Sequence, residues 1–143
     1  MSSANDPDAE IALLARAVMR LARRLRVEAP PGGLSGGALG LLATLHREGP
    51  LTGVQLAAAE GLKPQSLTRL LAGLEADGLI GRVADQADRR NLLIALLPDG
   101  RDALREAMRQ RRRWLAEALA DRLDDDERTV LINAAALMLR LAL

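Results

Sequence analysis

The chain has 143 residues, enough for one domain with a sizeable core, and its formal net charge of +1 points to no particular class of partner. It contains no cysteine and one histidine, His46, which excludes disulfides, thiolate catalysis and metal sites built from cysteine or histidine clusters. Trp114 is the only aromatic residue, so the core must be aliphatic, and the abundant leucine, alanine and arginine favour helices.

The N-terminal residues 1–10 are acidic and lack the basic start of a secretory signal. No apolar run approaches the ~20 residues that a membrane span needs. We therefore expect a soluble, cytoplasmic protein without a membrane partner.

The first predicted helix covers residues 8–27. Its apolar residues recur every three or four positions, as on one face of an amphipathic helix: Ile11, Leu14, Val18, Leu21 and Leu25. The prolines and glycines of residues 30–33 are expected to break it. A second helix is expected from an N-cap at Ser35 to near Arg47, because Gly49 and Pro50 cannot extend it.

Two further helices are separated by a tight turn. Thr52 is the N-cap candidate of a short helix that Gly61 ends. The next helix begins at Lys63 and Pro64, since proline at a first helical position loses no hydrogen bond, and ends at Gly78. Its apolar side is made of leucines: Leu67, Leu70, Leu71 and Leu74. Two helices joined by a glycine-bearing turn are typical of a helix-turn-helix.

A β-hairpin and two helices complete the chain. Residues 79–83 and 92–96 favour short strands, and the mostly polar residues 84–90 favour a charged tip between them. A long helix is predicted from Pro98 to Asp121. Asp124 and Glu127 have the spacing of a capping box that opens a strongly apolar last helix.

Short motifs occur along this plan at 51–56, 61–69 and 78–82, as Asp88-Arg89-Arg90 in the hairpin, and as Gly100-Arg101 in the long helix. In this order and spacing they are strongly specific, and the chain resembles the MarR family of bacterial transcription regulators over nearly its whole length. The resemblance implies a mainly α fold with a small β-hairpin wing. It implies one continuous compact domain, with a winged helix-turn-helix at 35–97 and helical dimerisation regions at 1–34 and 98–143.

The resemblance also implies the function: a ligand-responsive repressor that binds a pseudo-palindromic operator as a homodimer. Thiol-based sensing is excluded, and the effector stays unknown because the chain offers almost no aromatic lining for a phenolic ligand. We expect no cofactor, no metal and no enzymatic activity, because the usual nucleophiles and bases are scarce. A winged-helix protein-assembly module without specific DNA binding is the alternative.

The start of the helix at Lys63 carries polar side chains that can reach base edges and phosphates. The candidate DNA-binding residues of this helix are Lys63, Gln65, Ser66, Thr68 and Arg69. Gln65 suits adenine, and Arg69 suits guanine or a phosphate. The family usually has serine or threonine where this chain has Lys63. The alternative is that these residues form the solvated face of an ordinary helix.

The hairpin carries the remaining DNA-binding candidates: Arg82, Asp88, Arg89 and Arg90. In the family this aspartate orients an arginine that enters the minor groove or grips a phosphate, and negative potential in that groove favours such insertion. Arg82 would add affinity for the DNA backbone. The alternative for Asp88 and its neighbours is a surface salt bridge.

The first and last helices carry exposed apolar stripes that a symmetric dimer would bury. The dimerisation candidates are Leu14, Val18, Leu131, Leu137 and Leu141. The alternative is that the stripes pack within one chain.

A dense basic run in the long helix favours a solvated face over DNA contact: Arg109, Arg111, Arg112 and Arg113. Trp114 is interpreted as a packing residue rather than a ligand platform, and His46 as a surface residue rather than a sensor.

Overall fold

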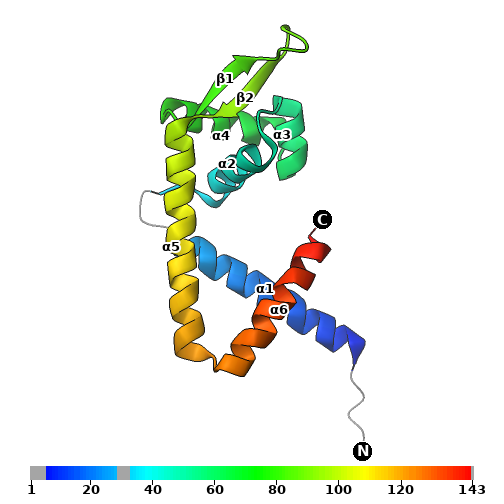
Figure 1. The fold of residues 1–143 in the computed structure, drawn as a ribbon. Helices are drawn as coiled ribbons and strands as arrows, with labels where there is room; N and C mark the ends of the chain where they lie inside the picture. Colours follow the sequence, from blue (N-terminus) through cyan, green and yellow to red (C-terminus); the bar gives the residue numbers. More distant parts are fainter. Residues whose placement is uncertain (1–5, 29–32, 143) are drawn as a thin grey trace, which may run out of the picture. The chain divides into compact units, whose positions relative to one another are not determined.

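The computed structural model describes residues 6–28 and 33–142. Six helices and a two-stranded antiparallel hairpin make up this part of the chain, which confirms the mainly α fold with a β-hairpin wing (Figure 1). The chain divides into two compact units, Ala29–Arg109 and Met1–Glu28 with Gln110–Leu143. No helix among the described residues is long and apolar enough to cross a membrane.

The unit Ala29–Arg109 contains α2 (Gly36–Glu48), α3 (Gly53–Glu60), α4 (Pro64–Ala76), β1 (Ile80–Ala84), β2 (Leu92–Leu96) and the first part of α5 (Pro98–Arg122). Its helices begin where local sequence predicts. The Ser35 hydroxyl accepts a hydrogen bond from the Ala38 N–H, and Thr52 forms a reciprocal capping box with Gln55. Gly61 ends α3 in the left-handed conformation, with φ 60°, which glycine adopts without steric cost.

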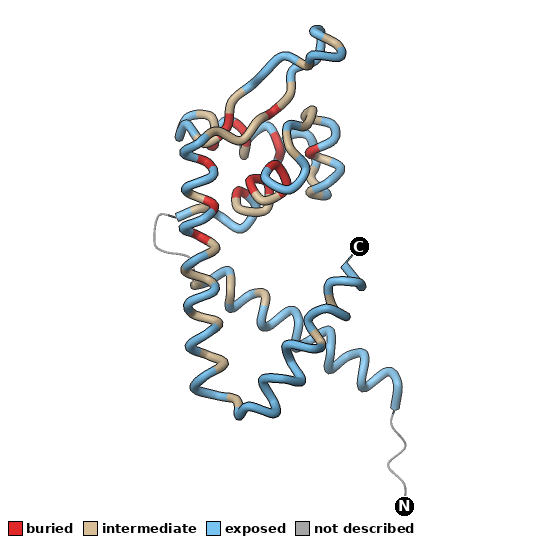
Figure 2. The backbone as a smooth tube through the Cα atoms, in the orientation of Figure 1, coloured by how far each residue is buried: buried red, intermediate tan, exposed pale blue. Residues whose placement is uncertain are grey.

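The core of this unit is aliphatic, as the composition requires. Leu41, Leu42, Leu56 and Ile94 are fully buried at its centre, and the buried residues of Figure 2 gather on these helices and the hairpin base. Leu104 of α5 belongs to the same cluster. The winged helix therefore includes the first two turns of α5 beyond residue 97, because those turns supply part of its hydrophobic core.

The base of the hairpin is attached to the rest of the unit by backbone contacts. Strands β1 and β2 pair antiparallel, with Arg82 opposite Ile94. Leu51, between α2 and α3, exchanges two backbone hydrogen bonds with Ile94, of 3.1 and 2.7 Å. At Gly100 an added Cβ would lie 2.1 Å from the Leu79 carbonyl oxygen, so the start of α5 requires glycine to approach the chain before β1.

The other unit contains α1 (Pro7–Val27), the rest of α5 and α6 (Asp125–Leu141). The predicted capping box opens α6: Asp124 and Glu127 exchange hydrogen bonds with each other's backbone N–H at 2.8 and 3.0 Å. The predicted helix break at 30–33 falls mostly outside the described residues. Neither α1 nor α6 has a buried residue, and both are mostly exposed, with a few intermediate positions, in Figure 2.

The end of α1 is attached to α5 inside this unit. The Nε of Arg111 donates to the Leu25 carbonyl oxygen at 3.2 Å. The Arg24 guanidinium lies 5.7 Å from the centroid of the Trp114 ring, within cation–π range. Trp114 thus contacts the adjoining helix, in agreement with its interpretation as a packing residue.

Candidate nucleic-acid interface

The start of α4 presents its polar side chains to solvent. Leu67, Leu71 and Leu74 are buried and hold one face of the helix against the core. The predicted contact residues lie on the exposed part of the helix start: Lys63, Gln65, Ser66, Thr68 and Arg69. The structure therefore brings all five together on one accessible surface.

Two details of this surface concern hydrogen bonding. Lys63 is the N-cap, and its side chain caps none of the first N–H groups of α4, so these groups remain available as donors to an anion. The Thr68 hydroxyl donates to the Pro64 carbonyl oxygen at 2.9 Å. Its proton is used within the helix, so Thr68 is left to act as an acceptor.

The tip of the hairpin is held by Asp88. Its carboxylate accepts hydrogen bonds from the Arg90 N–H, Nε and Nη2 at 3.1, 3.0 and 3.1 Å. These bonds lower the pKa of Asp88 and raise that of Arg90, because each stabilises the charged form of its partner. The Asn91 N–H donates to the Asp88 carbonyl oxygen at 3.0 Å, which closes the tip.

Arg89 and Arg90 are both exposed, and Arg89 has no hydrogen bond or ion pair with any residue that the structure describes. The arginine that Asp88 orients is thus Arg90, while Arg89 has no such partner among the described residues. Sequence alone could not distinguish the two, because the choice depends on the backbone path of the tip.

Arg82 is paired with a residue that sequence reasoning missed. Its Nε and Nη2 both lie 2.9 Å from Oε1 of Glu75, in the last turn of α4. No local sequence pattern predicts this pair, because the two residues belong to different secondary-structure elements. Their side chains are about half and one-third exposed (47% and 35%).

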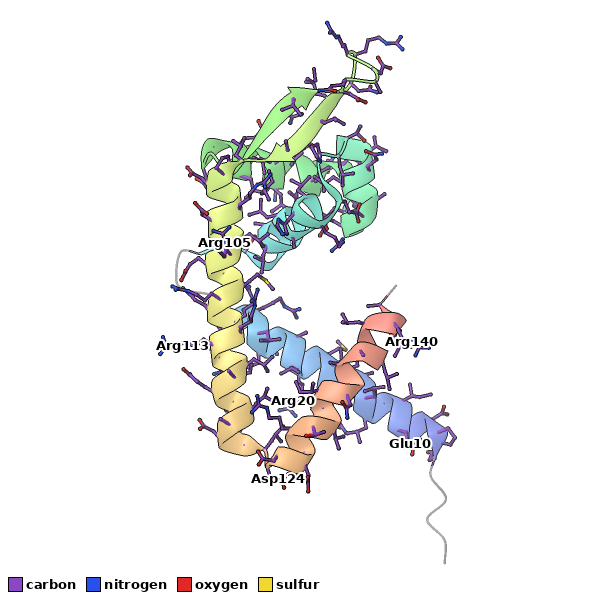
Figure 3. All side chains as sticks on the ribbon, viewed as in Figure 1. Glu10, Arg20, Arg105, Arg113, Asp124 and Arg140 are labelled. Carbon is purple, nitrogen blue, oxygen red and sulfur yellow. The ribbon has the colours of Figure 1, made fainter. Side chains whose placement is uncertain are left out.

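The basic run of α5 is mostly committed to partners on its own unit or helix. Arg109 pairs with Glu106, and Arg113 pairs with Glu117, at 2.8 and 3.0 Å. Arg105 and Arg113, labelled in Figure 3, are both paired with a carboxylate on the same helix. These pairs favour a solvated face over DNA contact. His46 is exposed at the end of α2, as expected of a surface residue.

A pocket of about 480 Å³ opens on the winged-helix unit, between the start of α2, the second half of α4 and α5. Arg69, Asp77 and Glu106 supply its charged lining, and leucines and alanines supply most of the rest. Among the described residues no group of three or more histidine, cysteine or carboxylate side chains could hold a metal ion.

The dimerisation candidates are exposed in the single chain. Leu14 is 51% exposed and Leu137 is 58% exposed, and the other three candidates lie between 38% and 81%. Further large apolar side chains of α1 and α6 are exposed with them: Ile11, Met19, Ile132 and Leu139. Both helices thus carry apolar surface that the single chain does not cover.

Comparison with known proteins matches the winged helix to a family model. The model of the MarR family covers residues 34–92. An HTH-type transcriptional regulator of Mycobacterium bovis is 41% identical over 137 residues, 95% of each chain. Among solved structures, a protein of Pseudomonas aeruginosa described as a transcriptional regulator has a TM-score of 0.81 at 36% identity, and a MarR family protein of Bacillus stearothermophilus has 0.77 at 26%. Each of these alignments covers 95% of both chains. The chain therefore belongs to the MarR family and is a DNA-binding transcriptional regulator.

Proposed function

We propose that this regulator binds a pseudo-palindromic operator as a homodimer and represses transcription. The observation that carries the proposal is the exposed polar start of α4 together with the unpaired Arg89 of the wing, both in one compact unit. A single winged helix makes few contacts with DNA, whereas two copies double them and match a two-fold symmetric site.

In this proposal α4 lies in the major groove. Gln65 pairs with an adenine edge, and Arg69 pairs with guanine or a phosphate. Lys63 and Ser66, with the uncapped N–H groups of the helix start, hold the phosphate backbone. Burial of the α4 leucines sets the orientation of these side chains.

The wing supplies the second set of contacts. Arg90, the arginine that Asp88 orients, enters the minor groove or grips a phosphate, and Arg89 beside it adds a further contact. Asp88 holds the tip and the Arg90 guanidinium before binding, so that the loop does not have to be ordered on binding. Arg82 adds a phosphate contact at the base of the wing.

Homodimerisation would cover the apolar faces of α1 and α6. Each fully buried leucine or valine side chain contributes roughly 1.5–3 kcal/mol. Leu14, Val18, Leu131, Leu137 and Leu141 are the residues proposed to contribute most. Because the dimer fixes the distance between two α4 helices, it also sets the spacing of the operator half-sites.

Ligand response is proposed to act through the pocket beside α4. Arg69 belongs both to the pocket lining and to the proposed DNA surface, so a small molecule held there would alter the position of α4 or occupy Arg69 directly. The pocket lining contains no aromatic residue, so stacking on a phenolic ring would contribute nothing.

The experiment is a mobility-shift titration of the full-length protein with DNA from upstream of its own gene, with unrelated DNA of equal length as competitor. We expect a sequence-specific shift by the dimer. The alternative, a winged-helix assembly module, predicts only weak binding that the competitor removes. That result would refute the proposed function.

A further inference from the structure

Glu75 joins the end of α4 to the base of the wing. Its Oε1 accepts from both Nε and Nη2 of Arg82, each at 2.9 Å. The chain between the two elements is tightly closed, because the Gly78 N–H donates to the Glu75 carbonyl and the Leu79 N–H to the Leu74 carbonyl, both at 3.0 Å. The ion pair therefore spans a short turn that is closed by backbone hydrogen bonds.

The strand register explains how Arg82 reaches α4. Arg82 lies opposite Ile94, and residues directly opposite in an antiparallel pair share one face of the ribbon. Ile94 is 1% exposed, so this is the face toward the core. Arg82 leaves the ribbon on that side and meets Glu75, with about half of its side chain still exposed.

Arginine has five N–H donors, and this ion pair leaves both donors of Nη1 and one of Nη2 unused. A carboxylate that holds Nε and one edge of the guanidinium fixes the plane in which the remaining donors point. An arginine without such a partner is conformationally mobile, and it loses side-chain entropy when it binds a phosphate. Arg82 has already lost part of that entropy in its pair with Glu75.

We infer that Glu75 is a positioning residue for DNA binding, which holds the Arg82 guanidinium ready for a phosphate without touching DNA itself. The inference rests on the proposed operator binding. It opposes the simplest electrostatic expectation, because a carboxylate near DNA repels phosphates and its removal should raise affinity.

The test measures the dissociation constant for the operator fragment by fluorescence anisotropy at several salt concentrations. The variants are Glu75→Gln, Arg82→Ala and the double variant. Glu48→Gln is the matched control, since Glu48 pairs with exposed Arg47 at 3.3 Å on α2 of the same unit. Thermal unfolding of each protein accompanies the titrations.

We expect Glu75→Gln to weaken specific binding several-fold, and Arg82→Ala to weaken it at least as much. Both should make the slope of log K against log salt shallower by about 0.9, the value for one lost phosphate contact. The double variant should bind no more weakly than Arg82→Ala, and Glu48→Gln should bind like the unmodified protein.

Tighter or unchanged binding by Glu75→Gln overturns the inference. Weaker binding with an unchanged salt slope also overturns it, because Glu75 would then only stabilise the fold. If Arg82→Ala weakens binding while Glu75→Gln does not, the proposed function stands and the positioning role fails. If the unmodified protein shows no specific binding, the proposed function itself fails, and the inference falls with it.

Discussion

Asp88 binds Arg90 and not Arg89: its two carboxylate oxygens accept from the backbone N–H, Nε and Nη2 of Arg90. Both arginines are exposed, and Arg89 has no partner among the residues that the structure describes. Two adjacent arginines therefore differ in their surroundings: Asp88 orients Arg90, and Arg89 is not held by it.

Replacing Arg89 with alanine should weaken specific DNA binding by about tenfold, within the ~1–3 kcal/mol range of a good arginine contact. The free energy of unfolding should stay the same, because Arg89 has no partner among the described residues. Anisotropy titrations and thermal unfolding measure the two quantities. Arg105→Ala is the control, since Arg105 pairs with exposed Asp102 on α5; equal loss in both variants would refute the wing assignment.

The Asp88–Arg90 pair should persist across the physiological pH range. Arg90 lowers the pKa of Asp88 in the folded protein, so the pairing is fully present above the ordinary aspartate value of about 3.9 and is lost as pH falls through the lowered pKa. The Asp88 carboxylate carbon shift in an NMR titration reports this directly. A midpoint at or above the ordinary value would contradict the pairing.

Asp88→Asn should weaken operator binding less than Arg89→Ala does. An asparagine oxygen can still accept from the Arg90 backbone N–H, but the charge that holds the guanidinium is gone. The tip is then less ordered before binding, while Arg89 remains present. Dissociation constants for the two variants give the comparison, and an Asp88→Asn protein that binds as tightly as the unmodified one would show that tip order is irrelevant.

Much of this fold could be predicted from short-range chemistry. The caps at Ser35, Thr52 and Asp124 were predictable because each uses a side chain that reaches an N–H only three residues away. The strands followed from apolar runs bounded by turns. Lys63 was predicted to begin α4 despite its atypical cap, because Pro64 marks the first helical position.

The remaining features depend on tertiary placement. The bonds Arg82–Glu75 and Arg111–Leu25 join different elements, so no spacing rule announces them. The packing of Leu104 into the winged-helix core could not be predicted either. The apolar periodicity of α5 is continuous, so it does not show which turns pack against which unit.

Gly100→Ala should destabilise the winged helix. Its Cβ would lie 2.1 Å from the Leu79 carbonyl oxygen, and backbone cannot move aside cheaply, so the loss should be about 2–3 kcal/mol. Gly73→Ala is the matched control: nothing lies within 4 Å of the added Cβ inside α4, and alanine should raise stability by up to ~1 kcal/mol. Chemical denaturation measures both. Equal effects would contradict the close approach of α5 to the chain before β1.

Charge on the apolar faces should disrupt the dimer. The variant Leu14→Glu, combined with Leu137→Glu, places carboxylates on both surfaces proposed to be buried between copies, where an unpaired charge is costly. Sedimentation velocity should show a monomer, against a dimer for the unmodified protein. Glu10→Gln is the control at an exposed polar site of α1. A monomeric unmodified protein would refute the dimer.

Operator binding by the intact protein decides whether this regulator is a dimer with a specific DNA site. The measurement is the dissociation constant and stoichiometry for DNA from upstream of its own gene, compared with a shuffled sequence of equal length at physiological salt. We expect two chains per duplex and at least ~10³-fold preference for the native sequence. Equal affinity for the two sequences, or one chain per duplex, would refute specific binding by a dimer.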